Sequence, residues 1–124
     1  MKLRDVVLGD IDEKKTRKDP TNSKDLINFH YSLTASPPDD EWLVYFDEIR
    51  KERAQNDPFT PPINRHGDHF VMSCAPSELA AHDKNLRKDV VLANRKYRQA
   101  WEERQRNRKG VMDAIDEAIK KLKK

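Results

Sequence analysis

The chain has 124 residues, which suits one domain of ordinary size. Charged residues make up 38% of it and hydrophobic residues 35%, so we expect a small core beneath a strongly solvated surface. No stretch approaches the roughly 20 apolar residues that span a bilayer, and residues 1–5 lack the apolar run of a secretory signal. The single cysteine, Cys74, cannot form an internal disulfide. These features exclude an integral membrane protein and predict a cytoplasmic protein with no membrane contact.

The net charge of +3 is distributed unevenly along the chain. Residues 1–75 hold 11 Lys/Arg and 14 Asp/Glu, and residues 76–124 hold 14 and 8. The first part is therefore net acidic and the second net basic. Any attraction to a polyanion is predicted to come from the C-terminal part.

The N-terminal third contains two predicted strands. Residues 3–11 mix Val7 and Leu8 with charged residues, which predicts a short strand at a sheet edge. Residues 12–25 are nearly all charged or polar and are predicted to form a surface loop. The clearest strand signal is residues 26–34, where apolar and polar side chains alternate. The apolar members of this alternation are Ile27, Phe29, Tyr31 and Leu33.

A helix and a further strand follow. Prolines and acids end the second strand and favour a helix over residues 40–54, whose apolar stripe includes Trp42 and Phe46. This stripe is predicted to pack against the sheet. Residues 55–67 contain three prolines and are predicted to be a loop long enough to carry function. Residues 69–75 indicate a short buried strand that holds Cys74.

From Ser77 the pattern is helical for more than thirty residues, and one stripe of this helix is predicted to face the core. Beyond Trp101 the stripe continues through Arg104 and Arg108, so we expect packing to end near Trp101 while the helix runs on into solvent or a partner. The members of the stripe that precede those arginines are Leu79, His82, Leu86, Val90, Ala93, Tyr97, Ala100 and Trp101.

The course of the chain at Gly110 has two interpretations. Glycine after a basic turn is typical of a helix end, and an interior glycine costs about 1 kcal/mol relative to alanine, so we predict a break or kink. The alternative is one continuous helix with a spacing suited to a coiled coil. In either case the apolar face after Gly110 is too short to be stable alone and needs a partner. The predicted partner-binding residues are Val111, Ile115, Ala118, Ile119 and Leu122.

The predicted fold class is two-layer α+β. A small sheet of about three strands is packed by two helices, residues 40–54 and the first half of the long helix. Residues 1–101 are predicted to form this α+β core domain. Residues 102–124 are predicted to form a basic helical C-terminal extension, which either belongs to the same domain or binds a partner.

Residues 94–109 form the strongest charged run, with seven basic residues and two acids. Arginines interleaved with Tyr97 and Trp101 are typical of surfaces that bind single-stranded nucleic acid. The basic side chains do not all share one side of the helix, however, so a solvated or salt-bridged helix face is the competing interpretation. The predicted nucleic-acid ligands are Arg95, Arg98, Arg104, Arg106, Arg108 and Lys109.

The histidines are the one candidate metal site. His66 and His69 flank Asp68, and His30 lies on the polar face of a predicted strand; imidazole and carboxylate groups are common metal ligands. This spacing is not diagnostic, and ordinary turn histidines explain it as well. No Gly-rich phosphate loop, cysteine pair or nucleophile motif accompanies it, and no cofactor is predicted.

Three function classes follow in order of preference. The first is an interaction or assembly protein that uses its long C-terminal helix to self-associate or to bind a protein partner. The second is a nucleic-acid-binding protein that acts through residues 94–109. The third is a metal-dependent enzyme with a site near His66 and His69; enzymatic activity is the least favoured class because no motif names a reaction.

Overall fold

The structure is a computed structural model that describes residues 5–18, 26–34 and 39–123. The start of the first predicted strand, the second part of the predicted loop over residues 12–25, and the prolines before the first helix lie outside the described residues. The described elements, in chain order, are β1 (Val7–Ile11), α1 (Glu13–Lys18), β2 (Ile27–Thr34), α2 (Asp40–Asn56), β3 (Ile63–His66), β4 (His69–Cys74), the 3-10 turn η1 (Pro76–Glu78) and α3 (Leu79–Leu122).

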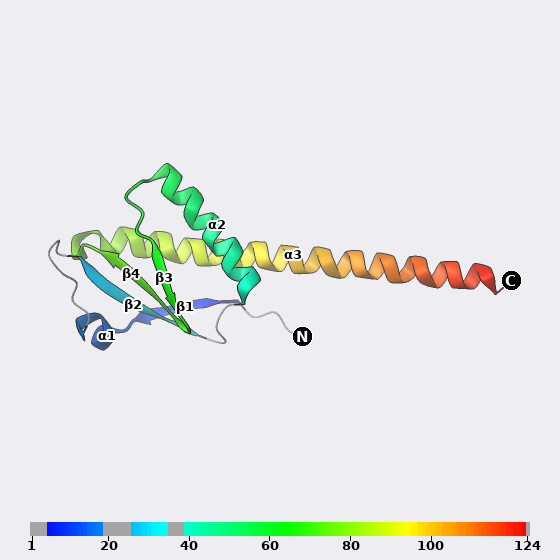
Figure 1. Cartoon of the computed structure of the whole chain (residues 1–124), viewed down its shortest axis with the longest axis horizontal. Helices are drawn as coiled ribbons and strands as arrows, with labels where there is room; N and C mark the ends of the chain where they lie inside the picture. The colour runs from blue at the N-terminus through cyan, green and yellow to red at the C-terminus, as the bar shows by residue number, and fades with distance from the viewer. Residues whose placement is uncertain (1–4, 19–25, 35–38, 124) are drawn as a thin grey trace.

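The α+β fold class is confirmed, with four strands in place of about three. The strands form one antiparallel sheet in the order β1-β2-β4-β3. The register of β2 and β4 pairs Phe29 with Met72 and Tyr31 with Phe70, so the apolar members of both strands share one face. Figure 1 shows α2 and α3 beside the sheet, with α3 continuing far beyond it.

The additional strand, β3, corrects the prediction that residues 55–67 are entirely a loop. Residues Ile63–His66 pair with β4 across a tight turn, in which His66 lies opposite His69. Gly67 has φ 63°, a left-handed conformation that glycine adopts without steric cost, and this allows the two-residue hairpin. The three prolines obscured the strand, although the Gly67-Asp68 pair is a hairpin signal.

The prediction of a loop immediately after β1 is also corrected, because Glu13–Lys18 forms the short helix α1. The carboxylate of Asp12 accepts a hydrogen bond from the amide of Lys15 at 3.1 Å, which caps the helix and lowers the pKa of Asp12. The side chain of Thr16 is buried and accepts a hydrogen bond from the His30 amide at 3.2 Å. Capping and this contact with β2 explain a helix in a segment with almost no apolar residues.

The core lies between the apolar face of the sheet and the two long helices, as the sequence predicts. The ring of Phe46 stacks on those of Trp42 and Phe70, with centroids 5.2 and 5.1 Å away. Cys74 is buried, and burial raises the pKa of its thiol. Helix α3 contributes Leu86, Val90 and Ala93, all on the predicted stripe.

Helix α3 is continuous from Leu79 to Leu122, so the predicted break at Gly110 is wrong. The N-terminal half of the helix is fixed by packing on the core, and each further residue then adds a backbone hydrogen bond without a new nucleation step. A single exposed glycine makes the helix less stable by about 1 kcal/mol, which does not outweigh the stability gained as the helix continues past it. The two candidate helices of the sequence are therefore one.

Candidate functional site

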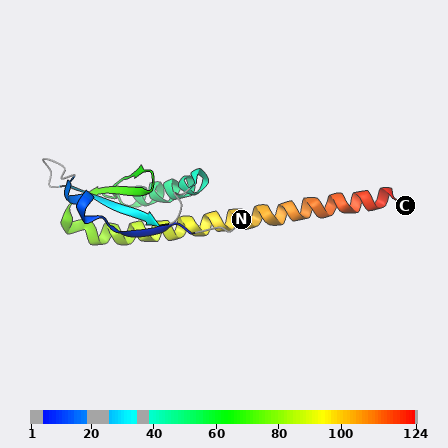
Figure 2. The same cartoon turned by 90° about the horizontal axis from the view of Figure 1, so that it is seen from below.

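The distal half of α3 is the least covered part of the described structure. Every residue from 102 to 123 is exposed, whereas Tyr97 and Trp101 are still partly buried. Figures 1 and 2 show α3 leaving the domain as a straight rod in both views. We call residues 102–122 the projecting segment; at about 1.5 Å per residue it is roughly 30 Å long. The prediction that packing ends near Trp101 is confirmed.

An apolar row runs along the projecting segment. Its side chains are strongly exposed, from 45% for Ile119 to 85% for Leu122. Their spacing of three and four residues places them on one side of the helix. The row consists of the five predicted partner-binding residues and one that the prediction omitted, Met112; its members are Val111, Met112, Ile115, Ala118, Ile119 and Leu122.

The apolar row lies on the same side of α3 as the core. At about 100° per residue, Ile115 and Ile119 return to the direction of Val90, which is buried against the sheet and α2. The domain ends on this side at the first turn of α2, where both terminal nitrogens of Arg104 donate to the Glu41 carboxylate at 2.6 and 2.7 Å. The space beside the apolar row is therefore open from Arg104 outward.

The six predicted nucleic-acid ligands separate into two groups. Arg98 donates to Asp5 at 2.6 Å and Arg104 is paired with Glu41, so acids of the domain already neutralise both. Glu41 also raises the pKa of Arg104. The remaining four are exposed and have no ion pair with any residue that the structure describes. These are Arg95, Arg106, Arg108 and Lys109.

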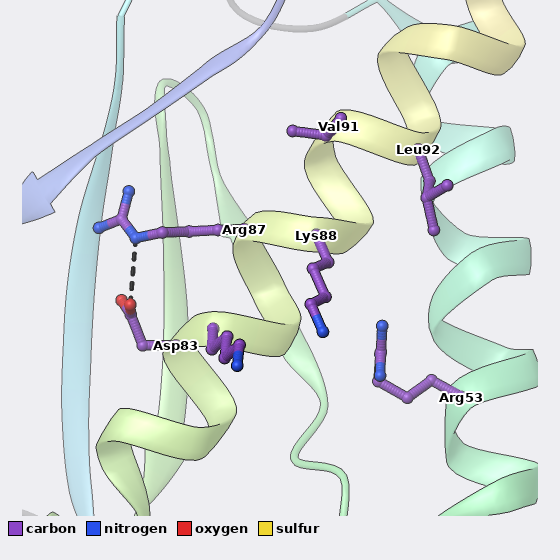
Figure 3. Close-up of a pocket in the computed structure, with 7 residues that line it drawn as sticks. Arg53, Asp83, Arg87, Lys88, Val91 and Leu92 are labelled. Carbon is purple, nitrogen blue, oxygen red and sulfur yellow. Dashed lines mark hydrogen bonds and ion pairs between the residues drawn. The ribbon is translucent and has the colours of Figure 1, made fainter.

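Upstream of these arginines, an open groove of 590 Å³ lies between α2 and α3. Val91 and Leu92 line it and are 55% and 37% exposed. Figure 3 shows Lys88 of α3 and Arg53 of α2 pointing toward each other across it. Arg87, at the other side, is paired with Asp83 at 3.1 Å. The groove thus combines an apolar wall with cations.

A buried ion cluster, which the sequence did not predict, lies beside this groove. Asp89 is fully buried and accepts hydrogen bonds from Arg50 at 2.9 Å and from Arg53 at 2.6 to 3.1 Å. Burial lowers the pKa of Arg50, whereas the hydrogen bond to Asp89 raises the pKa of Arg53. An acid between the apolar positions Leu86 and Val90 was the available signal. The cluster joins α2 to α3 and is structural.

The histidines of the predicted metal site come together on the outer face of the sheet. The ring of His69 lies 5.5 Å from that of His66 and 5.7 Å from that of His30, measured between centroids. Asp68 accepts from His69 at 3.3 Å, an interaction that lowers the pKa of Asp68. Within the described part of the chain, no three His, Cys, Asp or Glu side chains are arranged to hold a metal ion. The metal prediction therefore gains no support.

Comparison with protein-family models, with curated proteins and with solved structures finds no match to this chain. Among the described residues, no helix combines the length and apolar character that crossing a membrane requires.

Proposed function

We propose that this protein is an interaction or assembly protein that binds another protein chain through the projecting segment of α3. One observation carries the proposal: residues 102–122 extend from a folded domain with a row of exposed apolar side chains. Contiguous apolar side chains on a protein surface usually mark an interaction site. The unpaired, buried Cys74 supports a reducing compartment, the cytoplasm, as the place of action.

Without a partner, the projecting segment contributes little to the stability of the protein. The domain gains little from it, because the described contacts end near Trp101 and Arg104. A partner that covers side chains such as Ile115 and Ile119 removes their apolar surface from water. The favourable free energy of this burial is about 25 cal/mol per Å². The uncovered end of a helix frays in water, so a partner also stabilises the helical conformation of this segment.

Removal of residues 109–124, which carry the whole apolar row, is expected to abolish association and leave the domain intact. A chain ending at Arg108 should sediment as a monomer, whereas the full chain should form a larger species alone or with a partner from the native host. The melting temperature should be nearly the same in both, because the core ends before the deletion. Two monomers that retain no partner would overturn the proposal.

A matched pair of full-length variants separates the apolar row from general helix effects. Ile115→Gln with Ile119→Gln removes two apolar side chains from the row, and association should weaken strongly. Asp113→Gln with Lys120→Gln changes two exposed residues outside the row and should leave association intact. Equal effects of the two pairs would show that the row is not the contact.

Nucleic-acid binding is the second candidate, favoured by the basic side of α3 that faces away from the core. Lys84, Lys88, Arg95, Arg106 and Lys109 are exposed and fall on this side. It extends past the groove lined by Val91 and Leu92, which offers apolar contact to unstacked bases. This arrangement adds Lys84 and Lys88 to the predicted ligands.

The test compares two substitutions that remove the same charge. If the basic side binds phosphates, Arg95→Gln with Arg106→Gln should reduce the slope of log K against log salt by about 2. Arg98→Gln with Arg104→Gln should reduce it less, because Asp5 and Glu41 already neutralise those arginines. Titrations with single-stranded and duplex oligonucleotides at several salt concentrations measure both, and absence of binding at low salt eliminates this candidate.

A further inference from the structure

Four exposed charged residues lie seven positions apart along the projecting segment and its end: Glu102, Lys109, Asp116 and Lys123. In a coiled coil of two helices the pattern repeats every seven residues, so residues at this interval lie along one line of the helix. This line borders the apolar row. We call it the charged edge. The charges along this edge alternate in the order negative, positive, negative, positive. In the reverse direction the order begins with a positive charge, so two copies of the charged edge are complementary only when they run antiparallel.

From this pattern we infer that the projecting segment binds the projecting segment of a second copy in antiparallel orientation. Lys109 lies opposite the partner's Asp116, and Glu102 lies opposite the partner's Lys123. The inference rests on the proposed interaction function and names the occupant of the apolar row. Each ion pair occurs twice because the two chains are related by a two-fold axis.

The relative orientation of the two helices decides which edges of the apolar row lie next to each other. A two-fold antiparallel pair places the same edge of both helices together, so the charged edge faces its reverse. A parallel pair places the charged edge against the other border of the row, which holds Arg104, Val111 and Ala118. Lys109 would then approach Arg104 of the second helix, with no compensating pair. The charges therefore disfavour the parallel arrangement.

The position of the domain also opposes a parallel pair. The apolar row faces the side of α3 that carries α2, and α3 is straight in both views (Figures 1 and 2). A parallel helix on the row would run back into α2, whose first turn is held to Arg104 by Glu41. In the antiparallel pair the partner's Lys123 instead lies beside Glu102, just outside the domain. The two domains then lie at opposite ends of the pair.

The same register covers the apolar row. Met112 packs against the partner's Ile115 at the centre, and Leu122 reaches toward the partner's Gln105 and Trp101. Ile119 packs on the aliphatic stem of the partner's Arg108. If one helix is displaced by seven residues relative to the other, apolar side chains contact only apolar side chains of the partner. In that register, however, Asp116 lies opposite the partner's Asp116, and the two negative charges repel. Charge therefore selects the first register.

Reversal of one charge tests the ion pairs. Sedimentation equilibrium of the full chain should show a dimer, and Asp116→Lys should weaken it about tenfold, because two attractive contacts become repulsive. Adding Lys109→Asp to Asp116→Lys restores the pairs and should restore the affinity. Asp113→Lys makes the same change in net charge outside the row and should have little effect. Equal weakening by Asp116→Lys and Asp113→Lys would overturn the register.

Distances between identical spin labels determine orientation. In the proposed antiparallel dimer, two labels at Arg106→Cys, one on each chain, should lie roughly 20 Å apart along the helix axis, at about 1.5 Å per residue. In a separate dimer labelled at Lys120→Cys, the two labels should lie about as far apart. A parallel pair gives short distances at both positions. The shifted register gives a short distance at 120 and a longer one at 106. The protein without an added cysteine is the blank, since Cys74 is buried.

The outcomes separate the inference from the function on which it rests. A dimer with parallel labels, or a full-length monomer that binds a different protein through the apolar row, overturns the inference and leaves the interaction function in place. A monomer that binds no partner overturns both. Retained association after deletion of residues 109–124 also overturns both, because the contact would then not involve the apolar row.

Discussion

Replacement of Asp89 by alanine is expected to lower the free energy of unfolding by about 3–5 kcal/mol, because it leaves a buried guanidinium without its counter-ion. The Asp89 side chain is fully buried, and the Arg50 side chain is only 10% exposed. Arg50 would retain a hydrogen bond to the Pro61 carbonyl at 2.7 Å but no carboxylate. Urea denaturation of the wild type and the variant, followed by circular dichroism, measures the difference.

Asp47→Ala is the matched control for this substitution. Asp47 lies on α2 and pairs with Arg65 at 2.8 Å, and the two side chains are 59% and 41% exposed. Removing that more accessible pair should cost at most about 1 kcal/mol, as for other solvated ion pairs. Similar losses for Asp47→Ala and Asp89→Ala would contradict a special role for the buried cluster. Asp89→Asn should fall between them, since it retains shape and one acceptor.

The Asp89 cluster illustrates why part of the structure was inaccessible from sequence. The helical stripe identifies Leu86 and Val90 as core residues, and the intervening Asp89 is consistent with either a solvated edge or a buried pair. Only the crossing of α2 over α3 brings Arg50 and Arg53 to this acid. Such contacts depend on tertiary placement, which periodicity does not encode.

Periodicity was sufficient where one face of an element dominates. The alternation in β2 and the stripe of α3 both predict the buried residues, and the end of packing near Trp101 follows from the arginines after it. It was insufficient for β3, an edge strand with exposed side chains, and for α1, which is defined by a cap at Asp12. Short polar elements carry too little apolar signal for a period to be recognised.

The candidate site was predicted in location but not in form. The apolar residues after Gly110 and the need for a partner are visible in sequence, but the choice between a turn and a continuous helix depends on a small energy difference. Continuity has a structural consequence, because it carries the row of Ile115 and Ile119 away from the domain. A helix that turned back at Gly110 would have covered its own apolar face.

Trp42→Ala is expected to destabilise the domain by about 3–5 kcal/mol, comparable with the loss of Asp89. Trp42 is 2% exposed and stacks on Phe46. Its indole nitrogen donates to the Asn94 side chain at 2.8 Å, and the same oxygen accepts the Val6 amide at 2.9 Å. The alanine variant removes a large apolar side chain and one of the hydrogen bonds by which Asn94 links α2, α3 and the residue before β1.

Two further variants divide the Trp42 effect into its parts. Trp42→Phe retains the aromatic stacking and loses the hydrogen bond to Asn94, so it should cost less than the alanine variant. Trp101→Ala changes the other tryptophan, which lies at the domain boundary, and should cost about 1 kcal/mol or less. Thermal and urea denaturation followed by circular dichroism measures all three. If Trp101→Ala were as damaging as Trp42→Ala, Trp101 would belong to the core, and the end of packing would lie further along α3 than this residue.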